Sequence, residues 1–160
     1  MSLTQDILST WRGPRRVQAR FLGQGRNEVR ALIFVLIACV LMFVAATPYQ
    51  AREAQLDPEV PLMARLYWSG FLYIFLIPLL VYALAGIVWL LARVARRQVS
   101  GYQIRFTLIW ALLAVSPLTL IVGIVAGYAP GLALQVLGFV WLAIFGWFWA
   151  SGLLVAEDIT

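Results

Sequence analysis

Long uncharged stretches alternate with short charged ones along this chain. From Phe106 to Ala156 there is no Asp, Glu, Lys or Arg, and the turn signal Tyr128-Ala129-Pro130-Gly131 lies near the middle. A hydrocarbon core about 30 Å thick needs roughly 20 apolar residues in a helix, so this stretch is too long for one crossing and sufficient for two. Two further apolar runs precede it. The pattern predicts an all-α, polytopic integral membrane protein with four transmembrane helices, over residues 31–47, 67–92, 106–127 and 132–156.

The first 30 residues are different, because apolar residues recur there at helical spacing among arginines, with a break at Gly13-Pro14. This pattern is typical of an amphipathic helix that lies in the membrane interface. The alternative is a basic tail that only sets the topology. We therefore divide the chain into a basic amphipathic N-terminal segment, 1–30, and a four-helix transmembrane domain, 31–160.

Prolines mark the irregular places. Pro58 and Pro61, together with nearby charged residues, predict a loop from Pro48 to about Leu66. Pro78 and Pro117 lie inside predicted spans, and each predicts a kink in its helix.

The composition agrees with a membrane protein. Hydrophobic residues make up 63% of the chain and charged residues 12%, against about 25% charged in soluble domains. All 12 basic residues are arginines, and the net charge is +5. Because the arginines lie beside the apolar runs, they match lipid headgroups better than nucleic acid. We expect a subset of them to contact anionic phospholipid: Arg12, Arg15, Arg16, Arg20, Arg93, Arg96 and Arg97.

The distribution of arginines also predicts an orientation. They concentrate in residues 1–30 and 93–105, are sparse in 48–66 and are absent from the turn at Pro130. Since basic loops stay in the cytoplasm, the N-terminus, the 93–105 loop and the C-terminus are expected on the cytoplasmic side.

Small residues predict where helices meet. Lipid supplies no hydrophobic drive for helix association, so small side chains that permit close backbone approach matter most. One such face in the third span consists of Ser116, Thr119, Gly123 and Gly127, and a second ridge in the fourth consists of Ala143, Gly146 and Ala150. We expect Gly123 and Gly127 to pack against another helix of this chain.

Residues for chemistry are scarce. There is no histidine, the single cysteine, Cys39, lies in mid-span, and the middle of each predicted span is uncharged. Proton-coupled carriers need buried ionisable groups, and Ser69 and Ser116 lack a general base. The polar residues inside the spans can join helices by hydrogen bonds: Ser116, Thr119, Gln135, Tyr73 and Tyr82. We expect no enzymatic activity, no cofactor and no metal.

Several stretches resemble bacterial Yip-domain proteins: Pro14-Arg15-Arg16, Glu28-Val29-Arg30, Ala46-Thr47-Pro48, the proline inside the second span, and Ala150-Ser151-Gly152-Leu153 in the Trp-rich last span. The resemblance implies a small polytopic protein of the bacterial inner membrane. Members usually have five spans, and a re-entrant or interfacial N-terminal helix would account for the difference. Eukaryotic members bind small GTPases and other membrane proteins in vesicle traffic. The resemblance assigns no site residue.

Together these patterns favour a non-enzymatic membrane interaction or scaffold protein. Its partners would be other integral membrane proteins and anionic phospholipid, and it would be an accessory subunit of a larger membrane complex. The alternatives are a small transporter or channel, supported by the two proline-containing spans and Gln135, and a lipid-modifying enzyme that holds headgroups with its arginines.

Overall fold

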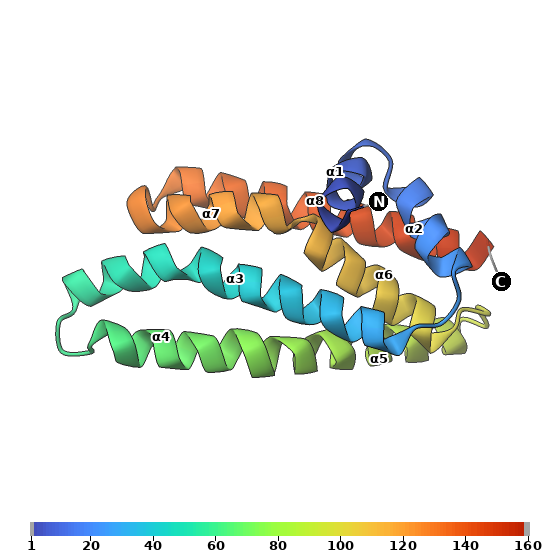
Figure 1. The fold of residues 1–160 in the computed structure, drawn as a ribbon, viewed down its shortest axis with the longest axis horizontal. Helices are drawn as coiled ribbons and strands as arrows, with labels where there is room; N and C mark the ends of the chain where they lie inside the picture. Colours follow the sequence, from blue (N-terminus) through green and yellow to red (C-terminus); the bar gives the residue numbers. More distant parts are fainter. Residues whose placement is uncertain (1, 159–160) are drawn as a thin grey trace.

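The computed structural model describes residues 2–158, which form helices joined by short links and contain no strand (Figure 1). The elements are α1 (Leu3–Arg12), α2 (Pro14–Gly23), α3 (Glu28–Leu56), α4 (Leu62–Phe71), the π-helical segment η1 (Leu72–Leu76), α5 (Ile77–Val94), α6 (Gly101–Ala114), α7 (Ser116–Tyr128) and α8 (Leu132–Asp158). The all-helical prediction is confirmed. Three helices are long and apolar enough to cross a membrane, Glu28–Leu56, Leu62–Val94 and Leu132–Asp158, and the bent pair α6–α7 is a fourth if it forms one span.

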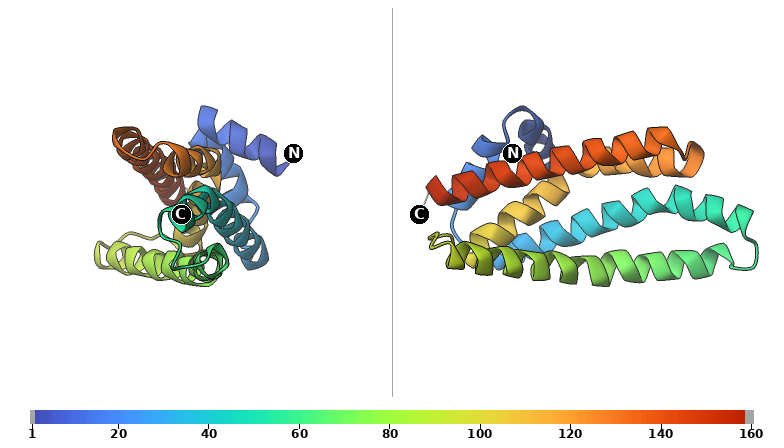
Figure 2. Two further views of the ribbon diagram at one scale, coloured as in Figure 1. Left: turned by 90° about the vertical axis from the view of Figure 1, so that its left-hand side faces the viewer. Right: turned by 180° about the vertical axis from the view of Figure 1, so that it is seen from behind.

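Two antiparallel hairpins and one oblique helix make up the bundle. Helix α3 runs beside α4–η1–α5, and α7 runs beside α8 on the other side of the molecule (Figures 1 and 2). Helix α6 passes diagonally between these layers, from the end of α5 to the start of α7. The most extensive contact between helices is that of α3 with α7. The α2–α3 link, the α5–α6 link and the end of α8 therefore share one end of the bundle, and the α3–α4 link and the α7–α8 turn share the other.

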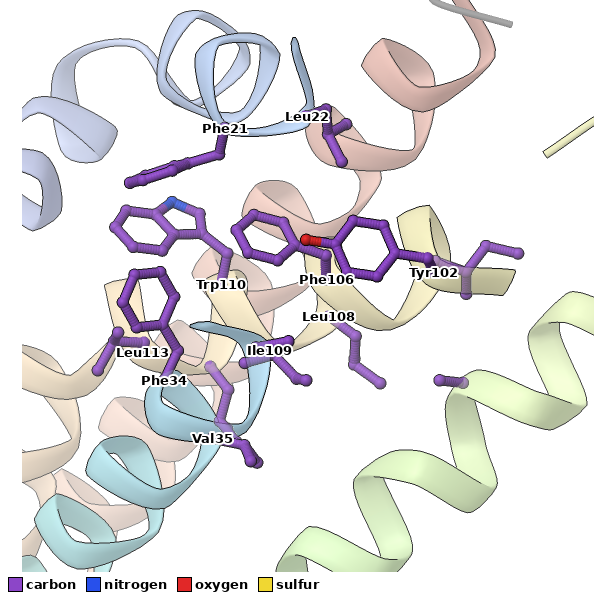
Figure 3. Close-up of a cluster of buried hydrophobic side chains, with 14 of the residues drawn as sticks. Phe21, Leu22, Phe34, Val35, Tyr102, Phe106, Leu108, Ile109, Trp110 and Leu113 are labelled. Carbon is purple, nitrogen blue, oxygen red and sulfur yellow. The ribbon is translucent and has the colours of Figure 1, made fainter. Parts of the chain in front are cut away.

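Helix α6 is the centre of the molecule. Ten of its successive side chains, from Arg105 onward, follow no amphipathic pattern, and nearly all of them are buried because other helices surround α6. Figure 3 shows Phe106 and Trp110 of α6 beside Phe21 of α2 and Phe34 of α3. The ring centroids of Phe21 and Trp110 are 4.6 Å apart, and those of Phe34 and Trp110 are 5.4 Å apart. These aromatic contacts join the N-terminal segment to α3 and α6.

The predicted loop over 48–66 is wrong at both of its ends. Helix α3 continues through Pro48 to Leu56, and α4 begins at Leu62. Proline has no N–H to donate to the carbonyl four residues earlier. Here the Thr47 hydroxyl donates to that carbonyl, Val44 O, at 2.8 Å. Because this hydrogen bond compensates for the missing one, and because the residues after Pro48 favour helix, the loop shrinks to residues 57–61.

The two prolines expected to kink their helices act differently. At Pro117 the chain bends by 50° between α6 and α7, which confirms that kink. Pro78 instead lies at the start of α5, directly after the π-helical segment η1. A π-helical turn is a common way to accommodate a distorted hydrogen-bond ladder. The segment Leu62–Val94 thus remains one long helix.

The N-terminal segment forms two helices rather than one. Gly13 separates them, and Pro14 occupies the first turn of α2, where its missing N–H costs nothing. The apolar side of α2, which includes Val17, Phe21 and Leu22, is buried, and α2 lies against α8 and α6. The pair α1–α2 covers the region where α6 meets α7 and α8 (Figure 1).

Candidate interaction surfaces

The small residues of α7 allow its backbone to approach α3 very closely. A Cβ added to Gly123 would lie 2.0 Å from Ala45 O, and one added to Gly127 would lie 2.6 Å from Pro48 Cβ. Backbone and proline atoms cannot move aside as a flexible side chain can. Glycine at these two positions is therefore a condition for the α3–α7 contact.

The other two residues of that predicted face lie nearer to the bend. Ser116 is buried at the start of α7. The Thr119 hydroxyl donates to Val115 O at 3.2 Å and accepts a hydrogen bond of 2.7 Å from Trp141 Nε1 on α8. The predicted face of α7 thus contacts two neighbouring helices: the glycines pack against α3, and Thr119 forms a hydrogen bond with α8.

The small-residue ridge of α8 lies open. Ala143 and Ala150 are exposed, and a Cβ added to Gly146 would meet no atom within 4 Å. Large apolar neighbours, including Phe139 and Trp147, are exposed beside the ridge, with Trp147 52% exposed. In contrast to the glycines of α7, these residues contact no other helix closely.

The four arginines of the N-terminal segment that were expected to contact headgroups have two kinds of environment. Arg12, Arg15 and Arg16 are exposed. Arg20 instead forms an ion pair of 2.5 Å with Asp6 of α1, a residue that is itself buried. Of the four arginines, Arg20 therefore also holds α1 and α2 together.

The arginines that follow α5 lie at the end of the bundle. The Arg93 guanidinium stacks over the Trp89 ring, 5.3 Å from its centroid, and Arg97 pairs with Glu157 near the end of α8. Arg96 has a left-handed backbone, with φ of 56°. This conformation ends α5 by turning the chain, and Arg97 N–H donates to Ala92 O at 2.9 Å.

Three polar residues of the N-terminal helices make contacts that the sequence patterns did not predict. Trp11 Nε1 donates to Ala114 O at 2.9 Å, and Trp110 Nε1 donates to the Thr10 hydroxyl at 3.2 Å. Gln18 Nε2 donates to Phe148 O at 2.8 Å, where the absence of a side chain on Gly152 leaves it room. Gln18 lies on the apolar side of α2, and that position is the only signal that could have indicated a buried partner.

Chemically reactive side chains do not cluster in the part of the chain that the structure describes. Within residues 2–158, no three His, Cys, Asp or Glu side chains come close enough together to hold a metal ion. Cys39 is buried in α3 as a free thiol. The hydrogen-bonding side chains Trp11, Gln18 and Thr119 are used in contacts between helices.

These observations define a class, an all-helical protein with three or four helices apolar enough to cross a membrane. In comparisons with known proteins, no family model, no curated protein and no solved structure matches the chain. The resemblance to bacterial Yip-domain proteins therefore stays a prediction from the sequence.

Proposed function

We propose that this protein is a non-enzymatic accessory subunit of a larger membrane complex. It packs against a larger integral membrane protein and is anchored on one side by anionic phospholipid. The observation that carries the proposal is the contrast between its two small-residue faces. Gly123 and Gly127 are closed by α3 of the same chain, whereas Ala143, Gly146 and Ala150 are open. Because small ridges allow helices to approach closely in lipid, the open ridge fits an apolar transmembrane helix of another protein.

The proposal includes four crossings, with α6–α7 counted as one broken span. Two contacts at one end of the bundle support this arrangement: Arg105 pairs with Glu28 at 2.6 Å, and Arg97 pairs with Glu157. They join the starts of α3 and α6 and bring the α5–α6 link to the end of α8. By the positive-inside rule this end faces the cytoplasm, in a bacterial inner membrane.

The exposed arginines support the lipid part of the proposal. Arg12, Arg15 and Arg16 point away from the core of the bundle, and Arg93 and Arg96 are exposed beside the α5–α6 link. Each arginine near an anionic surface contributes about 1 kcal/mol of attraction. A cluster of this size would hold one face of the protein against anionic headgroups.

Purification from native membranes in mild detergent tests the proposal. We expect a larger membrane protein to co-purify in fixed stoichiometry, and we expect the double variant Ala143→Leu, Ala150→Leu to lose it because leucine fills the ridge. The matched control is Ala83→Leu, which makes the same change at an exposed position of α5. A wild-type chain recovered alone, or a partner retained by the double variant, would contradict the proposal.

The alternative of a transporter or channel has one structural observation in its favour, the break between α6 and α7. Transporters use such breaks to expose backbone groups to substrate. Here the Ala114 carbonyl at the break accepts its hydrogen bond from Trp11, and Ala114 is buried. Gln135 is exposed and lies in a largely apolar groove with Met42 and Trp141. These contacts favour the accessory role.

A further inference from the structure

A small cavity opens between α5, the start of α6 and the α2–α3 link, at the arginine-rich end of the bundle. Its volume is about 310 Å³, near the lower limit for small-ligand sites. The residues that matter for its chemistry are Arg26, Tyr82, Gly86, Trp89, Gly101 and Arg105. Its two arginines, Arg26 and Arg105, are not among the arginines that the sequence led us to expect at lipid headgroups.

The charges at the cavity leave a net positive balance. Arg26 and Arg105 share a single carboxylate, since Glu28 Oε1 accepts from Arg26 Nε at 2.9 Å and from Arg105 Nη2 at 2.6 Å. Two guanidinium groups and one carboxylate leave one positive charge. The Arg105 guanidinium also stacks over the Tyr82 ring, 5.7 Å from its centroid, so that its position is fixed.

Hydrogen-bond donors without partners gather at the same place. The buried Nε of Arg105 has no partner among the residues that the structure describes. The Trp89 indole nitrogen lies 3.6 Å from where a Cβ would stand on Gly101. Within residues 2–158, neither this indole N–H nor the Tyr82 hydroxyl takes part in a hydrogen bond. Together with the guanidinium groups, these N–H and O–H groups can donate hydrogen bonds to an oxygen-rich anion.

The start of α6 adds a partial positive charge. Ser100 and Gln103 cap this helix through Ser100 Oγ and Gln103 Oε1, and Gly101, the first residue of α6, has no side chain to cover its backbone. A helix N-terminus carries about half an elementary charge and binds phosphate groups. The N-terminus of α6 and Arg105 therefore act on the cavity from α6, and Arg26 acts on it from the α2–α3 link.

The surroundings favour a ligand with an apolar part. Beyond the cavity, α5 presents exposed Ile87 and Leu90, and Gly86 leaves a gap on the same helix, since a Cβ there would meet nothing within 4 Å. We infer that this cavity binds the phosphate group of an anionic molecule, with an anionic phospholipid as the source that fits both the charged and the apolar walls. This inference deepens the lipid part of the proposed function by giving it a defined site.

Native mass spectrometry of the purified chain with added lipid tests the site. We expect wild type to retain phosphatidylglycerol over phosphatidylcholine by about tenfold, the ratio that 1.4 kcal/mol produces. Arg105→Gln should lower this preference clearly, because it removes the charge that the cavity directs at the phosphate group. Because Arg105→Gln also breaks the pair with Glu28, Gly86→Leu is the second variant, which blocks the cavity and leaves every charge in place. Ala83→Leu and Arg52→Gln are controls outside the cavity and outside the arginine set expected at headgroups, and both should retain the preference.

A separate arm distinguishes the two sources of phosphate. If inorganic phosphate raises the thermal midpoint of wild type but not of Gly86→Leu or Arg105→Gln, the site takes free phosphate, and its phosphate chemistry is supported. Equal retention of the two lipids by wild type, or an unchanged preference in Gly86→Leu, would overturn the site. Co-purification of the larger membrane protein is measured on the same variants. It should persist in all of them, so that failure of this site is distinguishable from failure of the proposed function.

Discussion

At the scale of single residues, the closest approach between two helices occurs where side chains are missing. Gly123 faces the backbone of Ala45, and Gly127 faces Pro48. Between helices in lipid there is no hydrophobic driving force, so association depends on the van der Waals contacts that such close packing provides. The stability of the α3–α7 pair therefore depends on the absence of one methyl group at each glycine.

Gly123→Ala should destabilise the protein markedly. The added Cβ would lie 2.0 Å from Ala45 O, so α7 must move away from α3, at a cost of about 1–3 kcal/mol or more. The thermal midpoint in detergent measures the effect. Gly138→Ala on α8 is the matched control, because its Cβ would meet nothing within 4 Å and alanine favours helix. Equal shifts of the midpoint in the two variants would contradict the close contact.

Replacement of Arg96 by glycine should have the opposite effect and stabilise the protein. Its φ of 56° lies in the left-handed region, which costs a residue with a side chain about 1–2 kcal/mol. Arg96→Gly should therefore raise the free energy of unfolding by about 1 kcal/mol, measured by denaturation in detergent. Arg96→Ala removes the same charge and keeps the strain, so it should give no such gain. If alanine stabilised the protein as much as glycine, charge and not backbone conformation would be the cause.

At the scale of elements, the N-terminal pair α1–α2 supports the bend between α6 and α7. The bend between α6 and α7 leaves the Ala114 carbonyl without its helical donor, since Leu118 N–H bonds to Val115 O instead. Trp11 Nε1 donates to this carbonyl, and the Trp11 ring meets Phe148 of α8 edge-on at 5.4 Å. One side chain of α1 thus stabilises the break and binds it to the last helix.

Trp11→Phe separates these two contributions. Phenylalanine keeps an aromatic ring against Phe148 but cannot donate to the buried Ala114 carbonyl, and an unpaired buried acceptor costs about 1–3 kcal/mol. We expect the thermal midpoint to fall accordingly. Trp147→Phe makes the same change at a residue that is 52% exposed and should have little effect. A loss no larger than that of Trp147→Phe would show that the hydrogen bond contributes nothing.

The elements also show what the sequence could predict. The predicted spans over 67–92 and 132–156 lie within single helical runs. A long apolar stretch can satisfy its backbone hydrogen bonds in a membrane by forming a helix. The loop over 48–66 was predicted from Pro58, Pro61 and the charged residues, but these prolines interrupt the helix only over residues 57–61, and at Pro48 the Thr47 hydroxyl supplies the missing donor. Helix α6 follows no amphipathic pattern, so its sequence gives no indication of which neighbours surround it. Trp11 and Arg105 find their partners far along the chain, and no local pattern indicates such contacts.

At the scale of the whole molecule, the long helices are longer than the hydrocarbon core of a membrane is thick. The helical run Leu62–Val94 has 33 residues, which is about 50 Å at 1.5 Å per residue, against a hydrocarbon core of about 30 Å. Arg52 lies near the end of α3, Asp57 in the α3–α4 link and Arg65 in the first turn of α4, and Arg65 pairs with Asp57 at 2.7 Å. We infer that these ends project into water, opposite the arginine-rich end.

The proposed arrangement in the membrane requires this polarity, with two links expected at one face and two at the other. Thiol labelling in intact cells tests it most directly. In a chain whose Cys39 is replaced by alanine, single cysteines are placed at Glu59 and Ala129, in the α3–α4 and α7–α8 links, and at Gln24 and Gln98, in the α2–α3 and α5–α6 links.

A membrane-impermeant reagent should label the first two positions in intact cells and the last two only after the membrane is opened. That result requires α6–α7 to cross as one broken span, with both termini of the bundle on the arginine-rich side. If Ala129→Cys remained unlabelled in intact cells while Glu59→Cys reacted, α6–α7 would be a re-entrant pair, and the four-crossing arrangement would be wrong.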